Sequence, residues 1–350
     1  MSVTGQRIVF PAKGQVVVEP FEVPTPGPGQ VLVRTVQTAV SAGTELSMLL
    51  GDLSNARFPA YPGYSSSGVV EAVGDGVEWP RVGDLVLSMG HHQTHVLLDL
   101  DPDRRGGPEY VEAIPAGVRP EHAAFAILGS VSLHGIRRAQ LGIGESVAVF
   151  GQGIVGQFLV QLAKASGCFP VIGVDVVPER LQLARSLGAD AVVDASREDP
   201  VGAIMRETGG RGAEAVFDAT RTSRTLPTMM KAAAMGGKVL VVGSVVGQVE
   251  IDAFTELQLR ELSIVGCFQP AAPTLPHHAF PWTQRRNRQA FLRLLATGGI
   301  HLDKLITHTV PYAAAPEIYR MIREGGTGWL GIVFTWDNGD PGQPTTERKS

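Results

Sequence analysis

The sequence predicts an α/β protein with two domains, one rich in short strands and one built on a doubly wound parallel sheet. Up to about residue 116, short apolar runs are separated by turns containing Gly and Pro, a pattern typical of strands. After residue 120, runs of Val and Ile alternate with helical segments, which is typical of a parallel sheet covered on both faces. The length of 350 residues also suits two domains better than one.

The first part of the chain contains five apolar segments of strand length. They are residues 7–10 (RIVF), 15–23 (QVVVEPFEV), 29–40 (GQVLVRTVQTAV), 66–74 (SSGVVEAVG) and 83–90 (GDLVLSMG). Helical periodicity is scarce in this part. We therefore expect a β-rich domain with several connecting loops.

The second part begins with a helical pattern over residues 121–141, and six apolar segments follow with helices between them. These six are residues 145–150, 170–176, 191–195, 213–220, 238–245 and 262–268. This rhythm predicts a doubly wound, nucleotide-binding sheet. The mixed C-terminal part is expected to complete the first domain. The predicted domains are therefore residues 1–122 with 298–350, and residues 123–297.

Composition narrows the classes of partner. The net charge is −4 and the basic residues are scattered, which argues against a nucleic-acid-binding face. The chain has no uncharged apolar run of about 18 residues and no secretory pattern in its first residues, so neither a membrane span nor export is expected. Two cysteines nearly a hundred positions apart do not make a disulfide framework. We expect a soluble cytoplasmic protein that acts on a small molecule.

A glycine-rich turn is the sharpest motif. The segment Gly151-Gln152-Gly153-Ile154-Val155-Gly156 directly follows the strand 145–150 and opens a helix, which is the context that a dinucleotide site requires. Gly151 permits the tight turn, Gly153 lets a pyrophosphate approach the backbone, and Gly156 lets the helix lie close to the strand. Free N–H groups at the start of the helix then face the phosphates.

An acidic residue stands at the end of the next strand. Asp175 follows Gly156 by nineteen positions and can accept hydrogen bonds from the adenine-ribose hydroxyls. It would repel a 2′-phosphate, and no Arg follows within the next four positions. The sequence therefore predicts NAD rather than NADP as the cofactor.

Two later strand ends are open to two interpretations. Gly243 and Ser244 follow one apolar strand, and Asp218 ends another. Strand ends of this kind face the cofactor crevice in a doubly wound fold, so a contact with the cofactor is one interpretation. A plain turn is the other, and the sequence does not choose between them. We take Gly243 and Ser244 as candidate cofactor contacts.

With these motifs in place, the chain resembles the medium-chain dehydrogenase/reductase superfamily, whose alcohol, sorbitol and threonine dehydrogenases have the same two-domain layout. The segments that carry the resemblance are PGPGQVLVRT (26–35), SAGTE (41–45), FPAYPGYSSSGVVEAVGDGV (58–77), VGDLV (82–86) and the glycine-rich turn. The resemblance covers almost the whole chain. It implies a Rossmann domain and a β-rich, GroES-like catalytic domain.

The resemblance fails at the catalytic zinc site. Zinc-dependent members bind the metal through a Cys in C-x-[ST]-D, a His in G-H-E, and a later Cys or Glu. Here Ala42 replaces the Cys, Tyr64 replaces the His, and the alignment places Ile127, or a near neighbour, at the third ligand. Ala and Ile cannot bind zinc and Tyr rarely does. Two cysteines also cannot supply the family's four-cysteine structural site. We therefore predict no metal.

Without zinc, hydrogen-bond donors must stabilise the reacting oxygen. Thr44 matches the family's proton-relay Ser or Thr. Tyr64 stands where the ligand His would project, so its phenol is a candidate donor. Glu45 matches an acidic residue behind the metal, and it could orient a His or act as a base. Each of these residues could instead be a satisfied structural group.

Three histidines cluster in the segment MGHHQTHV. The spacing of His92 and His95 can chelate a metal, but in an extended segment positions three apart point to opposite faces. The other interpretations are polar residues at a strand edge, or His92 or His95 facing the substrate as a proton carrier. Both are kept as candidate catalytic residues.

The sequence thus predicts a zinc-independent, NAD-dependent oxidoreductase that moves a hydride between the nicotinamide and a small substrate. A secondary alcohol, polyol, sugar or secondary metabolite is the expected substrate class. The alternatives are a reductase of activated C=C bonds and a non-catalytic NAD-binding sensor. By analogy with the superfamily, a homodimer or homotetramer is expected, paired through the strand 262–268. The identity of the substrate and the direction of the reaction are not readable from the sequence.

Overall fold

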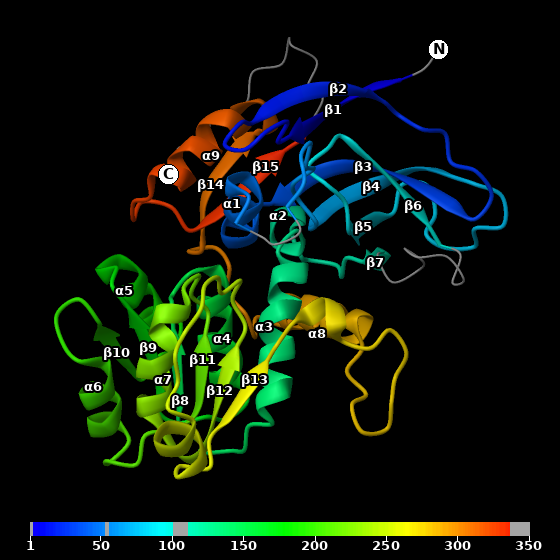
Figure 1. Cartoon of the computed structure of the whole chain (residues 1–350). Helices are drawn as coiled ribbons and strands as arrows, with labels where there is room; N and C mark the ends of the chain where they lie inside the picture. The colour runs from blue at the N-terminus through cyan, green and yellow to red at the C-terminus, as the bar shows by residue number, and fades with distance from the viewer. Residues whose placement is uncertain (1–2, 53–55, 101–110, 337–350) are drawn as a thin grey trace.

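The computed structural model describes residues 3–52, 56–100 and 111–336. Figure 1 shows a parallel sheet flanked by helices and, beside it, a separate strand-rich body that contains both the first strands and the last ones. The α/β fold class, with a Rossmann sheet and a second, β-rich domain, is thereby confirmed. Within these residues no helix is both long and apolar enough to cross a membrane.

The parallel sheet has six strands in the order β10-β9-β8-β11-β12-β13. Its strands are β8 (Val147–Phe150), β9 (Val171–Asp175), β10 (Ala191–Asp194), β11 (Ala213–Asp218), β12 (Ala233–Val241) and β13 (Ser263–Gly266). All five pairings are parallel. The strand order reverses at β8, which puts a crevice at the carboxyl ends of β8 and β11, where ligands bind in such folds.

Helices cover both faces of this sheet. They are α4 (Ile154–Ala165), α5 (Pro178–Ser186), α6 (Pro200–Glu207), α7 (Leu226–Ala232) and, toward the strand-rich domain, α3 (Ala126–Ala139) and α8 (Gln284–Ala296). Alternate residues of β8 point to opposite sides: Val147 and Val149 pack with α3, α4 and α8, whereas Ala148 and Phe150 pack with α6 and α7. This two-sided burial explains the continuous apolar runs of the sequence.

The strand-rich domain is built on a seven-stranded sheet in the order β14-β15-β3-β4-β5-β7, with β6 also paired to β3. The strands are β3 (Gln30–Ala39), β4 (Ser66–Val73), β5 (Leu85–Ser88), β6 (His95–Asp99), β7 (Val111–Ala113), β14 (Ile306–Pro311) and β15 (Gly331–Thr335). A separate ribbon pairs β1 (Thr4–Val9) with β2 (Val17–Glu22). The C-terminal β15 lies antiparallel to β3, so the two ends of the chain share this sheet.

The structure adds a helix where the sequence showed little helical pattern. Helix α1 (Ala42–Leu50) follows β3 and packs on α9 (Ala315–Glu324). Leu46 and Leu49 are buried on one face of α1, and Gly51 ends it in the left-handed conformation with φ 67°. Nine residues give only two apolar anchor positions, which is too short a pattern to stand out in a strand-rich segment.

Smaller differences occur at element ends. The helix expected over residues 121–141 is broken into α2 (Pro120–Ala123) and α3. β12 begins at Ala233, five residues before the apolar segment expected over residues 238–245. Single turns lie at Ser223–Thr225, Gln269–Ala271 and Tyr312–Ala314, with a π turn at Ala253–Gln258. The domain boundaries at residues 122 and 298 stay a prediction.

Candidate active site

The glycine-rich turn joins β8 to α4 with almost no spare room. Gly151 has φ +86°, and a Cβ there would lie 2.9 Å from the carbonyl oxygen of Ala219. A Cβ on Gly156 would lie only 1.8 Å from the carbonyl oxygen of Gly151. These two glycines are therefore required by the turn itself, one for its conformation and one for the close approach of helix and strand.

Gly153 is different, because a Cβ there would meet nothing within 4 Å. Its φ of −72° is also open to any residue, so the fold alone does not demand glycine at this position. Gly153 is the N-cap of α4, and no side chain caps the first N–H groups of the helix. Open space in front of uncapped N–H groups fits a pyrophosphate, which they would hold with the helix dipole.

Asp175 ends β9 directly beside this turn. One carboxylate oxygen accepts the backbone N–H of Gln152 at 2.5 Å, and the other accepts those of Val176 and Val177 at 2.7 and 3.0 Å. The carboxylate is thus held in place and half-buried at the edge of the crevice. The first basic residue after it, Arg180, instead donates to the carbonyl of Trp329 at 3.2 Å and lies over its ring.

The ends of β8, β11 and β12 meet at the crevice. A Cβ on Gly243 would lie 2.3 Å from the carbonyl oxygen of Thr220, so the turns after β11 and β12 need glycine to approach each other. The backbone N–H of Gly243 also donates to the carbonyl of Asp218 at 2.8 Å. The Asp218 carboxyl is fully buried, and burial raises its pKa against the lowering effect of its hydrogen bonds with Thr220. Its place favours packing of the turn over contact with a cofactor.

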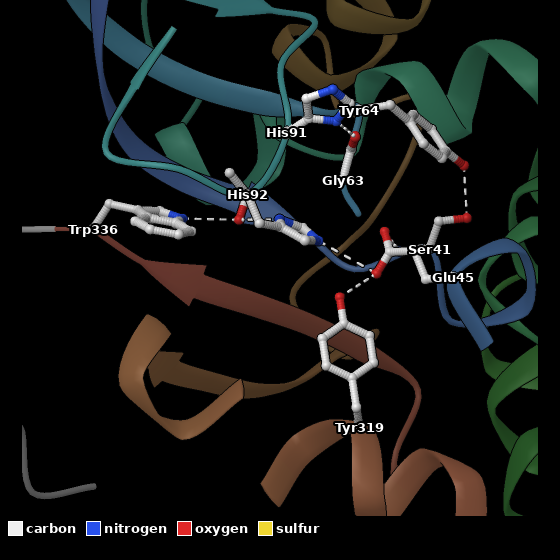
Figure 2. A network of polar contacts seen from close by, with 9 residues as sticks. Ser41, Glu45, Gly63, Tyr64, His91, His92, Tyr319 and Trp336 are labelled. Carbon is white, nitrogen blue, oxygen red and sulfur yellow. Dashed lines mark hydrogen bonds and ion pairs between the residues drawn. The ribbon is translucent and has the colours of Figure 1, made fainter. Parts of the chain in front are cut away.

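Hydroxyl groups from both domains gather where α1 faces the parallel sheet. The Thr44 hydroxyl lies 3.1 Å from that of Ser244, which follows β12. The Tyr64 phenol donates to the Ser41 hydroxyl at 2.6 Å (Figure 2). Thr44 also interacts with the Tyr64 phenol. The candidate catalytic residues Thr44 and Tyr64 and the candidate cofactor contact Ser244 therefore lie in one group, which we call the hydroxyl cluster.

Burial favours the neutral form of the Tyr64 phenol. Removal from water, supported by the negative charge of Glu45, raises its pKa to about 12, despite the opposing hydrogen bond with Ser41. A phenol of this pKa keeps its proton at physiological pH. Tyr64 is therefore suited to donate a hydrogen bond and poorly suited to act as a base.

Behind the cluster lies a buried polar network centred on Glu45, which is 1 % exposed (Figure 2). One carboxylate oxygen accepts the backbone N–H of Ser41 at 2.9 Å. The other accepts the phenol of Tyr319, from α9, at 2.6 Å and faces Nε2 of His92 at 3.3 Å. Glu45 thus holds the start of α1 from three directions.

His92 is held by both of its ring nitrogens. The Trp336 indole can only donate, and its N–H reaches the Thr38 hydroxyl at 2.9 Å. The same hydroxyl lies 2.7 Å from Nδ1 of His92, and Nε2 faces Glu45. His92 is fully buried, with both nitrogens engaged.

His91 and His95 make contacts outside this network. Nδ1 of His95 lies 3.0 Å from the Thr94 hydroxyl, and Nε2 lies 3.4 Å from Glu71 of β4. His91 contacts the carbonyl of Gly63 at 3.2 Å. The structure therefore brings Thr44, Tyr64, Glu45 and His92 together and leaves His95 outside this group. Across residues 3–52, 56–100 and 111–336, no three His, Cys, Asp or Glu side chains are grouped to hold a metal.

The positions aligned with the family's zinc ligands carry no suitable donor set. Ala42 opens α1, and Ile127 is 3 % exposed within the core cluster against which Tyr64 packs. Only the Tyr64 phenol has a heteroatom, and it is neutral and bonded to Ser41. A methyl group, a buried isoleucine and a protonated phenol do not fit zinc. Both cysteines, Cys168 and Cys267, are buried and free.

Several residues of the site were not anticipated. Ser41, the partner of Tyr64, precedes α1 at a position where a Ser usually caps a helix, so a weak signal existed. Its side chain makes no capping bond and accepts from Tyr64 instead. Tyr319 lies 274 positions from Glu45, and Trp336 lies 298 positions from Thr38, so only the fold brings them together.

Comparisons with known proteins agree with this architecture. The family model described as alcohol dehydrogenase GroES-like domain matches residues 27–117, and the one described as zinc-binding dehydrogenase matches residues 155–285. L-threonine 3-dehydrogenase of Pyrococcus abyssi (strain GE5 / Orsay) is 29% identical over 345 residues, covering 91% of this chain and 94% of that protein.

Two solved structures share the fold over nearly the whole chain. A dehydrogenase from Sinorhizobium meliloti 1021, bound to NADP, has a TM-score of 0.80 at 24% identity and covers 95% of this chain and 99% of its own. The 2R,3R-butanediol dehydrogenase from Bacillus subtilis has a TM-score of 0.79 at 23% identity, with coverage of 95% and 99%. At these identities the likeness shows the fold alone.

The fold and the site define an oxidoreductase with a Rossmann domain and a GroES-like catalytic domain. The chain belongs to the medium-chain dehydrogenase/reductase superfamily, in the branch of the zinc-type alcohol dehydrogenases. The resemblance inferred from the sequence is thereby confirmed.

Proposed function

We propose that this protein is a zinc-independent dehydrogenase that prefers NAD(H) and interconverts a secondary alcohol and the corresponding carbonyl compound. The observation that carries the proposal is the hydroxyl cluster at the domain junction. It places the Tyr64 phenol, at the position that the family resemblance assigns to a metal ligand, against Ser41 and near Thr44. A hydrogen-bond donor thus stands where a Lewis acid would otherwise act.

The cofactor would be held by the crevice of the parallel sheet. The space before Gly153 and the N–H groups at the start of α4 would take the pyrophosphate, and Asp175 would take the adenine ribose. The half-buried carboxylate of Asp175 disfavours a 2′-phosphate, and Arg180 is engaged with Trp329. When bound, the nicotinamide supplies hydride acceptance or donation. Ser244 lies near enough to Thr44 to border the reactive end of the crevice.

The protein's own groups would handle the reacting oxygen. Each hydroxyl has one proton to donate and lone pairs that accept. The Ser41 hydroxyl can therefore rotate to donate to Tyr64, which frees the phenol to donate to the reacting oxygen. In carbonyl reduction a proton would reach this oxygen through the hydroxyls of the cluster, and in alcohol oxidation the proton that leaves the oxygen would pass back through them to water. Thr44 offers a second donor. Glu45 and His92 are positioning residues in this scheme, because they hold α1 and do not point a free proton into the cluster.

Spectrophotometric turnover separates this proposal from its alternatives. Secondary alcohols and polyols are assayed with NAD and NADP, and ketones and enones with NADH and NADPH. The proposal expects alcohol oxidation and ketone reduction, faster with the non-phosphorylated cofactor. Reduction of enones without any ketone activity would instead indicate a C=C reductase. Tight NADH binding with no turnover on either panel would indicate a sensor.

We also propose that two copies pair through β13, within a soluble cytoplasmic enzyme divided at residues 122 and 298. β13 is the edge of the parallel sheet, and Ile264 on it is 38 % exposed. Leu259 and Phe254 nearby in the chain are more than half exposed. An unpaired apolar edge is a template for strand addition. Ile264→Asp is expected to convert a dimer into monomers in sedimentation equilibrium.

A further inference from the structure

A second charged site lies away from the cofactor crevice, where the end of α3 meets the start of α8 (Figure 1). Trp282, just before α8, is contacted by two guanidinium groups. The central carbon of Arg137 lies 3.7 Å from the centre of the indole ring, and that of Arg286 lies 4.1 Å from it. We call these three residues the Trp282 cluster.

The Trp282 cluster has no counter-charge in the part of the chain that the structure describes. Neither Arg137 nor Arg286 forms an ion pair there. The same helix shows what a balanced arrangement looks like, because Arg285 lies 3.4 Å from the buried carboxylate of Glu112. The first turn of α8 therefore carries Arg285, which the carboxylate of Glu112 neutralises, and next to it Arg286, which has no partner carboxylate among the described residues.

The helix makes this imbalance costly. The N-terminus of α8 is the positive end of its dipole, where acidic side chains are favoured and basic ones are not. Its first turn contains no acidic residue. Arg137 and Arg286 also repel each other: burial, with the added charge of Arg286, lowers the pKa of Arg137 to about 10. A bound anion would relieve both effects.

Buried polar atoms beside the Trp282 cluster also indicate that an anion binds there. Asn287 is fully buried, and its side-chain oxygen accepts a hydrogen bond from Arg137. Its Nδ2 has no partner among the described residues, and neither has Nδ1 of His134, one helical turn before Arg138. Two unpartnered nitrogens next to unbalanced cations indicate a missing group that is compact and able to accept several hydrogen bonds.

We propose that the Trp282 cluster, with Asn287, binds a phosphate group, either as free phosphate or as part of a small phosphomonoester. Guanidinium groups match phosphate in geometry and charge. Arg137 already donates through Nη1 to Asn287 and Arg286 through Nη1 to the Pro281 carbonyl, and each guanidinium has further N–H groups for an anion. Exposure rises from the buried Asn287 through the half-buried Arg137 to the exposed Arg286. This recessed gradient suits a small anion better than a flat protein surface.

The test titrates inorganic phosphate into the full-length protein at constant ionic strength, with and without saturating NADH, and follows binding by calorimetry. A parallel titration uses glycerol 3-phosphate. We expect saturable binding that NADH does not displace, and the tighter of the two ligands identifies the source of the phosphate group. Arg286→Gln is expected to weaken binding at least tenfold. Arg285→Gln, which removes the same charge one position earlier, is expected to change it less than twofold.

Four results would overturn the proposal. The first is the absence of saturable binding up to millimolar phosphate. The second is equal weakening by Arg285→Gln and Arg286→Gln, since binding would then be non-specific. The third is displacement by NADH, since phosphate would then bind at the glycine-rich turn. The fourth is a change of assembly state in Arg286→Gln without any phosphate binding, which would assign the arginines to acidic side chains of a second copy. Arg286 is exposed, so this variant is expected to fold, and its melting temperature verifies that.

Discussion

At the scale of single residues, Tyr64 has the greatest consequence for chemistry. In a zinc enzyme of this superfamily, a His at the aligned position donates an electron pair to a metal. Here a buried phenol with a pKa of about 12 donates a hydrogen bond to Ser41. In the proposed mechanism a hydrogen-bond donor therefore takes the place of a Lewis acid.

Tyr64→Phe tests this role. We expect turnover to fall about 10²-fold, because one donor to the reacting oxygen is lost, while the dissociation constant of NADH stays nearly unchanged. Steady-state kinetics and NADH titration measure the two effects separately. Tyr61→Phe, three positions earlier, is the matched control and is expected to retain full activity. Equal activities of Tyr64→Phe and the wild type would reduce Tyr64 to a packing residue.

Asp175→Asn tests the cofactor preference. The amide keeps the size of the side chain and removes its charge, so we expect NADH to bind about tenfold more weakly and NADPH to bind no worse or better. Asp194 ends the neighbouring strand β10 in register with Asp175 and provides the control, Asp194→Asn. A ratio of NADPH to NADH affinity that does not change in Asp175→Asn would contradict the assigned role.

At the scale of elements, the strand–turn–helix unit was predictable and the α1 network was not. The glycine-rich turn carries its information locally, since Gly151, Gly153 and Gly156 lie within six positions and act on their own strand and helix. Helix α1 depends instead on Tyr319 of α9, far along the chain. Short-range sequence patterns reveal a local constraint such as the glycine-rich turn. They do not reveal the contact between α1 and Tyr319, which forms only in the folded chain, where β15 pairs with β3.

The glycines of the turn are expected to separate folding from binding. Gly153→Ala should leave the melting temperature nearly unchanged, because its Cβ meets nothing within 4 Å, but it should weaken NADH binding by intruding on the pyrophosphate. Gly156→Ala should destabilise the whole domain, since its Cβ would overlap the carbonyl oxygen of Gly151. Thermal unfolding and NADH titration of both variants provide the comparison. Unaltered NADH affinity in Gly153→Ala would show that the pyrophosphate does not bind at this turn.

The contact between α1 and α9 predicts that the fold loses stability at alkaline pH. Burial, and then the charge of Glu45, raises the pKa of the Tyr319 phenol well above 10. A group that keeps its proton longer in the folded state stabilises the fold fully below its unfolded pKa, and this stabilisation is lost as pH rises through the folded value. Stability should therefore fall as pH rises above about 10, the ordinary pKa of tyrosine.

Tyr319→Phe isolates this effect. At neutral pH the variant should be less stable by about 1.5 kcal/mol, because a hydrogen bond to a charged group is lost. Above pH about 10 its stability should fall less steeply than that of the wild type, since one buried phenol fewer remains to ionise. Urea unfolding across this range measures both. Tyr312→Phe on the neighbouring turn serves as the control, and identical slopes for Tyr319→Phe and the wild type would contradict the burial of a protonated phenol.

At the scale of the whole molecule, the site exists only because two domains meet. Thr44 of one domain contacts Ser244 of the other, and Arg221, after β11, donates to the Ser47 hydroxyl of α1 at 2.9 Å. The alternation of strands and helices was sufficient to predict the two-domain fold, and the glycine-rich turn predicted a nicotinamide cofactor. Neither pattern could place Ser41 or Thr38, because their partners Tyr64 and Trp336 lie 23 and 298 positions away in the sequence.

The measurement that addresses the metal-free chemistry most directly is the zinc content of purified enzyme, set beside its turnover. Protein is prepared without added metal, analysed by mass spectrometry for zinc, and assayed for NAD-dependent alcohol oxidation before and after dialysis against a chelator. With Ala42, Tyr64 and Ile127 at the aligned ligand positions, we expect well under one zinc per chain and unchanged turnover. One zinc per chain, with activity that the chelator removes and added zinc restores, would contradict the proposed zinc-independent mechanism.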